Sequence, residues 1–137
     1  MQGRDASGSL PRESVLKIDK DCFVDPDWIQ DYLRVAIAVL GTHGVTVVSV
    51  RLCNSRHKGV HFYIEITPPV VAKLANRLQW LLGDDARRVD LNRARIRSGL
   101  KGWNKLFERV GARLRTIYRA SESRLTAFYA RSGAGIV

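Results

Sequence analysis

Hydrophobic and polar residues alternate near the start of the chain, and this alternation predicts a strand with one buried face. In residues 15–21, Leu16 and Ile18 point to one side, while Asp19 and Asp21 point to the other. Two carboxylates are therefore expected on the same face of the first strand.

Two further strands joined by a turn are predicted in the middle of the chain. Residues 45–53 are rich in β-branched side chains and residues 54–59 are turn-prone, so a hairpin is expected. Residues 60–67 alternate cleanly, which places His61 and Tyr63 on the polar face of the third strand.

Apolar residues at intervals of three and four predict two helices, one before and one after the hairpin. The first begins with Asp25 as its N-cap and runs to about Leu40. The second opens at Pro68-Pro69 and ends before Gly83. The order up to this point is β-α-β-β-α.

A short strand over residues 87–91 would complete the order β-α-β-β-α-β, the split βαβ motif of ferredoxin-like and RRM-like folds. The sequence thus predicts an α/β (α+β) fold with an antiparallel sheet, both helices on one face and the other face open. From Trp103 to Ile117, apolar residues step at three and four and predict a basic amphipathic helix. A further helical piece is expected through Leu125 and Phe128.

The length of 137 residues suits one compact domain with two appendages. Residues 1–13 lack hydrophobic periodicity and are expected to form a disordered tail. Residues 14–100 are expected to form the RRM-like domain. Residues 101–137 are expected to form a basic C-terminal helical extension, packed on or beside that domain.

The chain carries 23 Lys and Arg residues against 13 Asp and Glu residues, a net charge of +10 that favours a polyanionic partner, DNA or RNA first. Residues 84–137 hold 13 of the basic residues and 5 of the acidic ones, so the excess is C-terminal. Cys22 and Cys53 have neither zinc-ribbon nor disulfide-framework spacing, which fits a reducing cytoplasm. No apolar run reaches membrane-spanning length, so no membrane partner is expected.

The predicted topology brings candidate catalytic residues together, because its first and third strands are neighbours. Asp19, Asp21 and His61 are expected to project from the open face, and Asp90 would join them from residues 87–91. Mg²⁺ and Mn²⁺ prefer carboxylate oxygens, so the three acids are candidate metal ligands. His61 is a candidate contact to a nucleoside triphosphate. The candidate phosphate contacts in the adjoining turn are Ser55, Arg56 and Lys58.

A structural interpretation of the same residues stays open. Aspartates are common at the end of a strand, so Asp19 and Asp21 can simply mark a turn there, with neighbouring lysines to neutralise them. His61 can equally be a hydrogen-bonded sheet histidine beside Tyr63.

Three segments resemble, in order, the three motifs of the archaeo-eukaryotic primase superfamily, which includes primase-polymerases. They are Ile18-Asp19-Lys20-Asp21 after an apolar strand, Ser55-Arg56-His57-Lys58-Gly59-Val60-His61 on the hairpin, and Val89-Asp90 on a later strand. The resemblance covers about residues 15–92 and implies a catalytic palm of this topology. It also implies that Asp19, Asp21 and Asp90 bind divalent metal, and that His61 contacts the incoming nucleotide.

The sequence departs from this superfamily in two respects. Lys20 stands between the two acids, where an apolar residue is usual. Members also usually carry an additional N-terminal αβ unit, which the polar residues 1–13 cannot supply. A minimal or degenerate member is therefore expected, or one that needs a protein partner to provide the missing primase parts.

Clustered basic side chains are expected to neutralise nucleic-acid phosphates without reading sequence. They are Arg93, Arg95, Arg97 and Lys101. Tyr63 on an open sheet face would stack on a base. Trp80, Trp103 and Phe107 stand at helical spacing and are expected in the core.

Three functions follow from these patterns. The first is a primase-type nucleotidyltransferase that uses Mg²⁺ or Mn²⁺, and the alternative is a non-catalytic RRM-like nucleic-acid-binding protein. The third is a replication-initiator nuclease with Tyr118 or Tyr129 as nucleophile. This third function is the weakest, because the paired-histidine strand of such nucleases is absent from the sequence.

Overall fold

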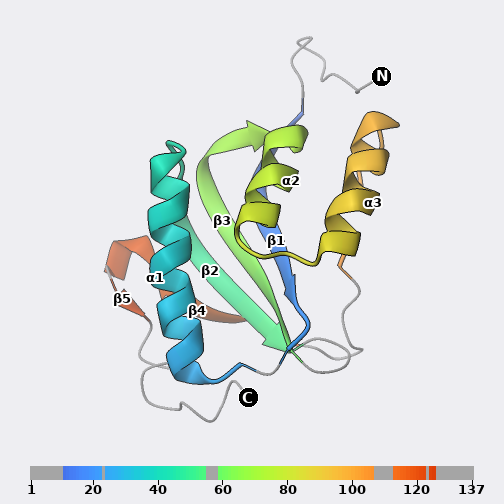
Figure 1. Cartoon of the computed structure of the whole chain (residues 1–137). Helices are drawn as coiled ribbons and strands as arrows, with labels where there is room; N and C mark the ends of the chain where they lie inside the picture. Colours follow the sequence, from blue (N-terminus) through green and yellow to red (C-terminus); the bar gives the residue numbers. More distant parts are fainter. Residues whose placement is uncertain (1–10, 23, 55–58, 107–112, 123, 126–137) are drawn as a thin grey trace.

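In the part of the chain that the structure describes, the fold is built on a five-stranded antiparallel sheet in the order β1-β3-β2-β4-β5 (Figure 1). The computed structural model describes residues 11–22, 24–54, 59–106, 113–122 and 124–125. The elements are β1 (Arg12–Lys20), α1 (Pro26–Thr42), β2 (Thr46–Asn54), β3 (Val60–Val71), α2 (Ala72–Leu81), α3 (Ala86–Arg97), β4 (Arg115–Arg119), a 3₁₀ turn (Ala120–Glu122) and β5 (Arg124–Leu125).

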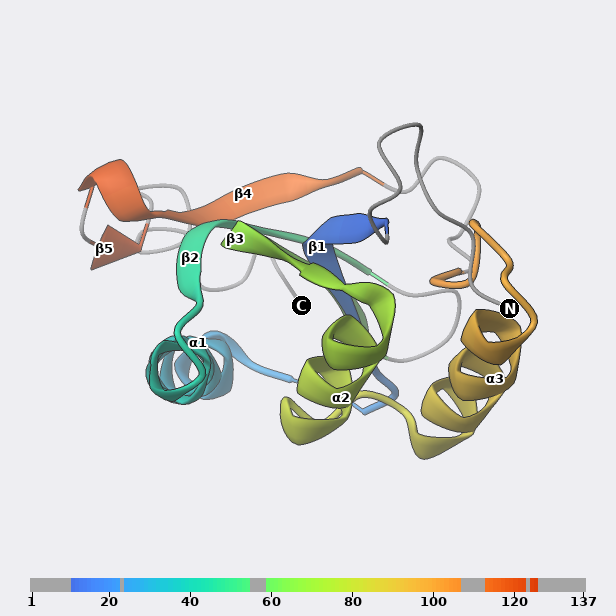
Figure 2. The same ribbon diagram turned by 90° about the horizontal axis from the view of Figure 1, so that it is seen from above.

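The predicted α+β class and the initial order β-α-β-β-α are confirmed. Helices α1, α2 and α3 all lie on the same side of the sheet, as Figure 2 shows. None of the described helices lies on the opposite side, which is called the helix-free face below. Residues 1–10 of the expected tail lie outside the described residues, and β1 begins at Arg12, earlier than predicted.

The core lies between the sheet and the helix layer. Leu16 and Ile18 of β1 and Phe62 of β3 are fully buried there, because alternate strand residues point toward the helices. From α1, Ile29 and Leu33 pack into the same cluster. Each fully buried side chain of this size contributes roughly 1.5–3 kcal/mol to folding, so the alternation fixes which face of the sheet is covered.

The N-terminus of α1 is capped as the sequence predicts. The backbone N–H of Trp28 donates a 2.8 Å hydrogen bond to Oδ1 of Asp25, and Pro26 follows in the first turn.

An Asp25→Ala variant is expected to lower the free energy of unfolding by about 1 kcal/mol, because one helical donor loses its partner. Urea denaturation would measure this loss. An Asp31→Ala change at an exposed position of the same helix serves as control, and an equal loss in both variants would contradict the capping role.

The strand predicted over residues 87–91 is wrong, because these residues form the first half of α3. Asp85 caps this helix, accepting a 3.0 Å hydrogen bond from the backbone N–H of Arg88. Val89, Asn92 and Ile96 form its buried stripe. Among the described residues, the sheet therefore lacks the strand that would pair with the outer edge of β1 in a complete split βαβ motif.

Side chains take the place of that strand on the β1 edge. The backbone N–H of Lys17 donates to Oε1 of Gln79 (2.9 Å), and the N–H of Asp19 donates to Oδ1 of Asp84 (2.9 Å). The guanidinium of Arg88 donates to the carbonyl oxygen of Lys17 (3.0 Å). Three backbone groups of an edge strand are thus satisfied without a further strand.

The helix predicted from Trp103 to Ile117 is also wrong in its described part. Arg115–Arg119 forms β4, which pairs antiparallel with β2, and Ile117 is fully buried. Leu125 lies in β5 instead of a helix, whereas Phe107 and Phe128 lie outside the described residues. Trp103 is buried, as expected of a core residue.

The second helix begins later than predicted. Strand β3 continues through Pro68-Pro69 to Val71, with a cis peptide bond between Thr67 and Pro68, and α2 starts only at Ala72. Within the described ranges, none of the helices combines the length and the apolar character needed to cross a membrane.

Candidate nucleotide site on the helix-free face

Polar side chains form two rows across β1, β3 and β2 on the helix-free face. In the first row Asp19 pairs with His61, which pairs with Cys53. In the next row Tyr63 stands between Lys17 and Arg51. The expectation that Asp19 and His61 share a face is confirmed, because directly paired residues of neighbouring strands point to the same side.

The Asp19 carboxylate and the His61 imidazole are close enough for an electrostatic interaction. His61 Nε2 lies 3.5 Å from Asp19 Oδ1. The His61 side chain is 3% exposed and that of Asp19 is 26% exposed. His61 Nδ1 is buried and has no hydrogen-bond partner among the described residues, which costs roughly 1–3 kcal/mol for a polar atom. The pair thus combines an accessible acid with a histidine nitrogen whose hydrogen-bonding capacity is unused.

The expectation of an open face is wrong at the centre of these rows. His61, Tyr63 and Cys53 are all buried although they point away from the helix layer. The Arg51 guanidinium carbon lies 6.0 Å from the centre of the Tyr63 ring. In this structure, the ring of Tyr63 is therefore not exposed for stacking on a base, and Asp19 is the accessible end of its row.

The β2–β3 hairpin closes against the segment that follows β1. Asp21 is exposed just beyond the end of β1. Gly59 has a φ of +116°, and a Cβ at this position would overlap the carbonyl oxygen of Lys20 and crowd the backbone of Cys22. The glycine therefore permits a close backbone approach that holds the hairpin beside the two acids. Ser55, Arg56 and Lys58 lie outside the described residues.

Lys20, between the two acids, contributes to packing on the helix side. Its ammonium lies 6.0 Å from the ring centre of Trp28 and 5.7 Å from that of Tyr32. Burial raises the pKa of the Tyr32 hydroxyl, with the nearby Asp84 adding to the shift, and this hydroxyl donates to the carbonyl oxygen of Leu82 (2.6 Å). Lys20 thus packs on the helix side with its ammonium placed over two aromatic rings.

Asp90 does not join Asp19 and His61, because α3 replaces the strand expected to carry it. It is exposed and its Oδ1 lies 3.3 Å from Arg93 Nη1 of the same helix. The described residues contain no group of three or more His, Cys, Asp or Glu side chains placed to hold a metal ion. The geometry therefore leaves Asp19 and Asp21 as the two candidate carboxylates.

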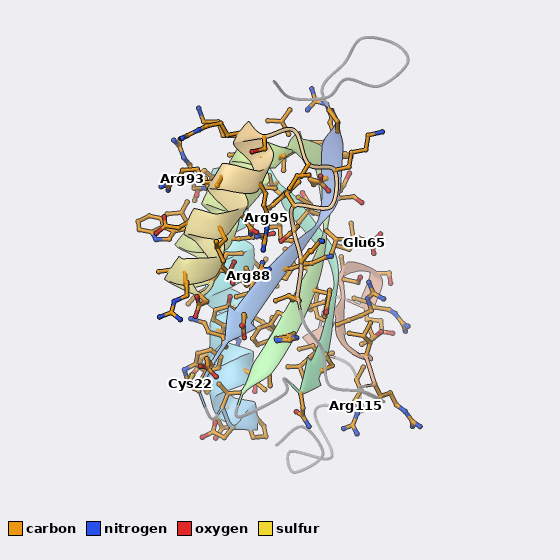
Figure 3. The ribbon with its side chains drawn as sticks, turned by 90° about the vertical axis from the view of Figure 1, so that its right-hand side faces the viewer. Cys22, Glu65, Arg88, Arg93, Arg95 and Arg115 are labelled. Carbon is orange, nitrogen blue, oxygen red and sulfur yellow. The ribbon has the colours of Figure 1, made fainter. Side chains whose placement is uncertain are left out.

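A buried ionic network next to Asp19 was missed in the sequence. The Asp84 side chain is 0% exposed and that of Arg88 is 11% exposed, with Arg88 Nη2 and Asp84 Oδ2 3.2 Å apart. Burial raises the pKa of the Asp84 carboxyl, and the hydrogen bond and charge of Arg88 act in the opposite direction. Figure 3 shows Arg88 between α3 and β1. The i,i+4 spacing of these residues was the available sequence signal.

The predicted phosphate contacts divide between two places. Arg93 and Arg97 line a groove between α2 and α3, whereas Arg95 donates to Asn92 Oδ1 (3.3 Å) and Lys101 lies in the turn after α3. Figure 3 shows Arg93 on the side of α3 that faces away from the sheet. For the nuclease alternative, Tyr118 is half-buried in β4 and Tyr129 lies outside the described residues.

Comparison with known proteins gives limited similarity. The sequence matches no protein-family model and no curated protein. Among solved structures, the polymerase domain of ligase D from Mycobacterium tuberculosis, in complex with DNA, is similar with a TM-score of 0.35 and 25% sequence identity. The similarity covers 58% of this chain and 30% of that chain. At this TM-score it assigns neither a fold nor a function to this protein.

Proposed function

We propose that the protein is a primase-type nucleotidyltransferase that binds a nucleoside triphosphate and a divalent ion, Mg²⁺ or Mn²⁺, beside Asp19. The observation that carries the proposal is the contact between Asp19 and His61 across β1 and β3, at 3.5 Å on the helix-free face. These are the two motif residues, far apart in sequence, whose meeting a primase-like site requires.

The two candidate carboxylates match the number that a single hard cation commonly uses. Mg²⁺ is commonly held by one or two carboxylates and keeps its other positions for water and substrate phosphates. Asp19 and Asp21 supply that number, and both are at least partly accessible. When bound, such an ion would neutralise triphosphate charge and stabilise the charge that develops during phosphoryl transfer. Asp90 has no part in this proposal, because it lies on α3.

His61 is assigned to the phosphates of the nucleotide. Its Nε2 lies 3.5 Å from Asp19 Oδ1, and a phosphate oxygen can only accept, so phosphate contact through Nδ1 would require a proton on that nitrogen. Its Nδ1 has unused hydrogen-bonding capacity among the described residues. Because this side chain is only 3% exposed, a nucleotide could contact it only after a local rearrangement of the helix-free face.

Activity should depend on the Asp19 carboxylate. With Mn²⁺, single-stranded template and labelled nucleoside triphosphates, Asp19→Asn is expected to lower product formation at least about 100-fold, because an amide binds hard cations far more weakly. Mn²⁺ affinity, measured by calorimetry without nucleotide, should fall as well. The backbone N–H of Asp19 keeps its bond to Asp84 in this variant, so folding should be preserved.

The matched control is Asp31→Asn, which changes an exposed acid of α1 that pairs with Arg34 at 3.8 Å. It should retain product formation and Mn²⁺ affinity within about twofold. Equal product from wild type and Asp19→Asn would reject the proposal. Absence of product from wild type, together with salt-dependent binding of nucleic acid, would favour the non-catalytic alternative instead.

A further inference from the structure

Residues of α2 and α3 line a basic groove. Both helices lie in the helix layer, away from the helix-free face (Figure 2). Its volume is about 670 Å³, within the range of ligand-binding clefts. Four of its lining residues are cationic and none of the described lining residues is acidic. The cationic residues are Lys73 and Arg77 from α2 and Arg93 and Arg97 from α3. We call this cleft the α2–α3 groove.

Helical spacing explains why the positive charges gather there. Lys73, Arg77 and Trp80 recur at intervals of four and three along α2, so they share one face. Arg93 and Arg97 are separated by four residues and share a face of α3 in the same way. Two parallel stripes therefore meet across the groove, and their charges are concentrated in a concave surface that attracts anions.

The groove also exposes apolar surface beside these charges. Trp80 is 56% exposed although its helical spacing predicts a core residue, and the neighbouring Leu81 is 42% exposed. A tryptophan face next to several cations is the combination that single-stranded nucleic acid requires, because bases stack on the ring while phosphates contact the basic side chains. Bases of a duplex are already stacked on each other and would not use the ring.

We propose that the α2–α3 groove binds single-stranded nucleic acid, with Trp80 stacking on a base and Lys73, Arg77, Arg93 and Arg97 contacting phosphates. This interaction is independent of nucleotidyl transfer, because the groove contains neither Asp19 nor His61. The Asp90 carboxylate beside Arg93 is mainly exposed and can be displaced by a phosphate. An acidic peptide would satisfy the charges but not the exposed tryptophan.

The test measures the binding of a labelled 20-nucleotide oligo(dT) by fluorescence anisotropy, with a chelator present and without nucleotide. Trp80→Ala should weaken binding about tenfold, in line with ~1–3 kcal/mol per stacked base, and Trp80→Phe should restore part of the affinity. A triple variant with Lys73→Gln, Arg77→Gln and Arg93→Gln should reduce the slope of log K against log salt by about 2, because each lost phosphate contact removes about 0.7.

The matched charge control is Arg34→Gln at an exposed position of α1. This change removes one positive charge outside the groove and should change the affinity for oligo(dT) less than twofold. Wild-type affinity in Trp80→Ala, or a triple variant with an unchanged salt slope, would overturn the proposal. Equal binding of a blunt duplex, or equal competition by polyglutamate, would also overturn it. Because the measurement excludes metal and nucleotide, failure here is distinguishable from failure of the proposed catalytic activity.

Discussion

Replacing Arg88 with methionine is expected to lower the free energy of unfolding by about 3–5 kcal/mol, because it leaves the Asp84 carboxylate buried without its partner. Methionine preserves much of the apolar stem but none of the guanidinium donors. In the native protein those donors also reach the carbonyl oxygen of Lys17 and Oδ1 of Asn104, both at 3.0 Å, and the carbonyl oxygen of Lys105. Urea unfolding at neutral pH would measure the loss.

The pH dependence of this loss identifies its cause. Without Arg88, the pKa of Asp84 in the folded state should rise further above its unfolded value, which is about 3.9. The folded protein then holds a proton that the unfolded chain has released, so the stability deficit should shrink as the pH falls from 7 toward 4. Adding Asp84→Asn should restore stability at neutral pH.

An exposed ion pair of similar composition provides the control. Arg93→Met breaks the pair with Asp90, in which the Arg93 and Asp90 side chains are 63% and 75% exposed. This change should lower the free energy of unfolding by no more than about 0.5 kcal/mol. If Arg88→Met were no more destabilising than Arg93→Met, the network on the β1 edge would not hold the fold together.

Replacing Gly59 with alanine should also destabilise the protein strongly, by about 3 kcal/mol. The backbone φ of +116° disfavours any L side chain, and the added methyl group would overlap the carbonyl oxygen of Lys20. That oxygen belongs to the backbone and cannot rotate away, so the hairpin must shift from the end of β1. Thermal or urea unfolding would report the loss.

Gly41→Ala is the matched control, because a Cβ at this helical position meets nothing within 4 Å. It should leave stability unchanged or raise it by up to about 1 kcal/mol, since alanine favours the helix. A Gly59→Ala protein as stable as Gly41→Ala would contradict the close approach described for the hairpin. The Gly59 variant should also lose Mn²⁺ affinity if the acids beside the hairpin bind the ion.

Hydrophobic periodicity predicts the elements in which the local pattern of side chains matches the secondary structure that forms. Leu16 and Ile18 alternate with Asp19, so the sequence predicts which face of β1 is buried. It also predicts that His61 points to the same side of the sheet as Asp19. Burial of His61 could not be predicted, because alternation gives the side of the sheet and not what covers it.

The sequence pattern does not predict helix α3, because a polar residue occupies the buried stripe of this helix. Asn92 is fully buried and donates to Oδ1 of Asn76 (3.2 Å), so the apolar helical pattern is interrupted between Val89 and Ile96. The segment Val89-Asp90-Leu91 alternates locally like a strand. A buried amide pair between two helices is a tertiary feature that periodicity of one segment cannot reveal.

The sequence pattern does not predict strand β4 for a different reason. Ile117 stands three residues after Leu114, which prolongs an apparent helical spacing, and the five-residue strand has only one buried side chain and no alternation to outweigh it. The partner of this strand is β2, more than sixty residues earlier, so the pairing that stabilises it is absent from the local sequence.

The closure of the β1 edge has a consequence for self-association. An edge strand with unpaired amides and carbonyls is a template onto which another polypeptide can add as a strand, the route to aggregation. Gln79, Asp84 and Arg88 occupy those backbone groups with side chains from the α2–α3 region. Local opening of that region would expose these backbone groups. The three side chains are therefore expected to limit aggregation through the β1 edge.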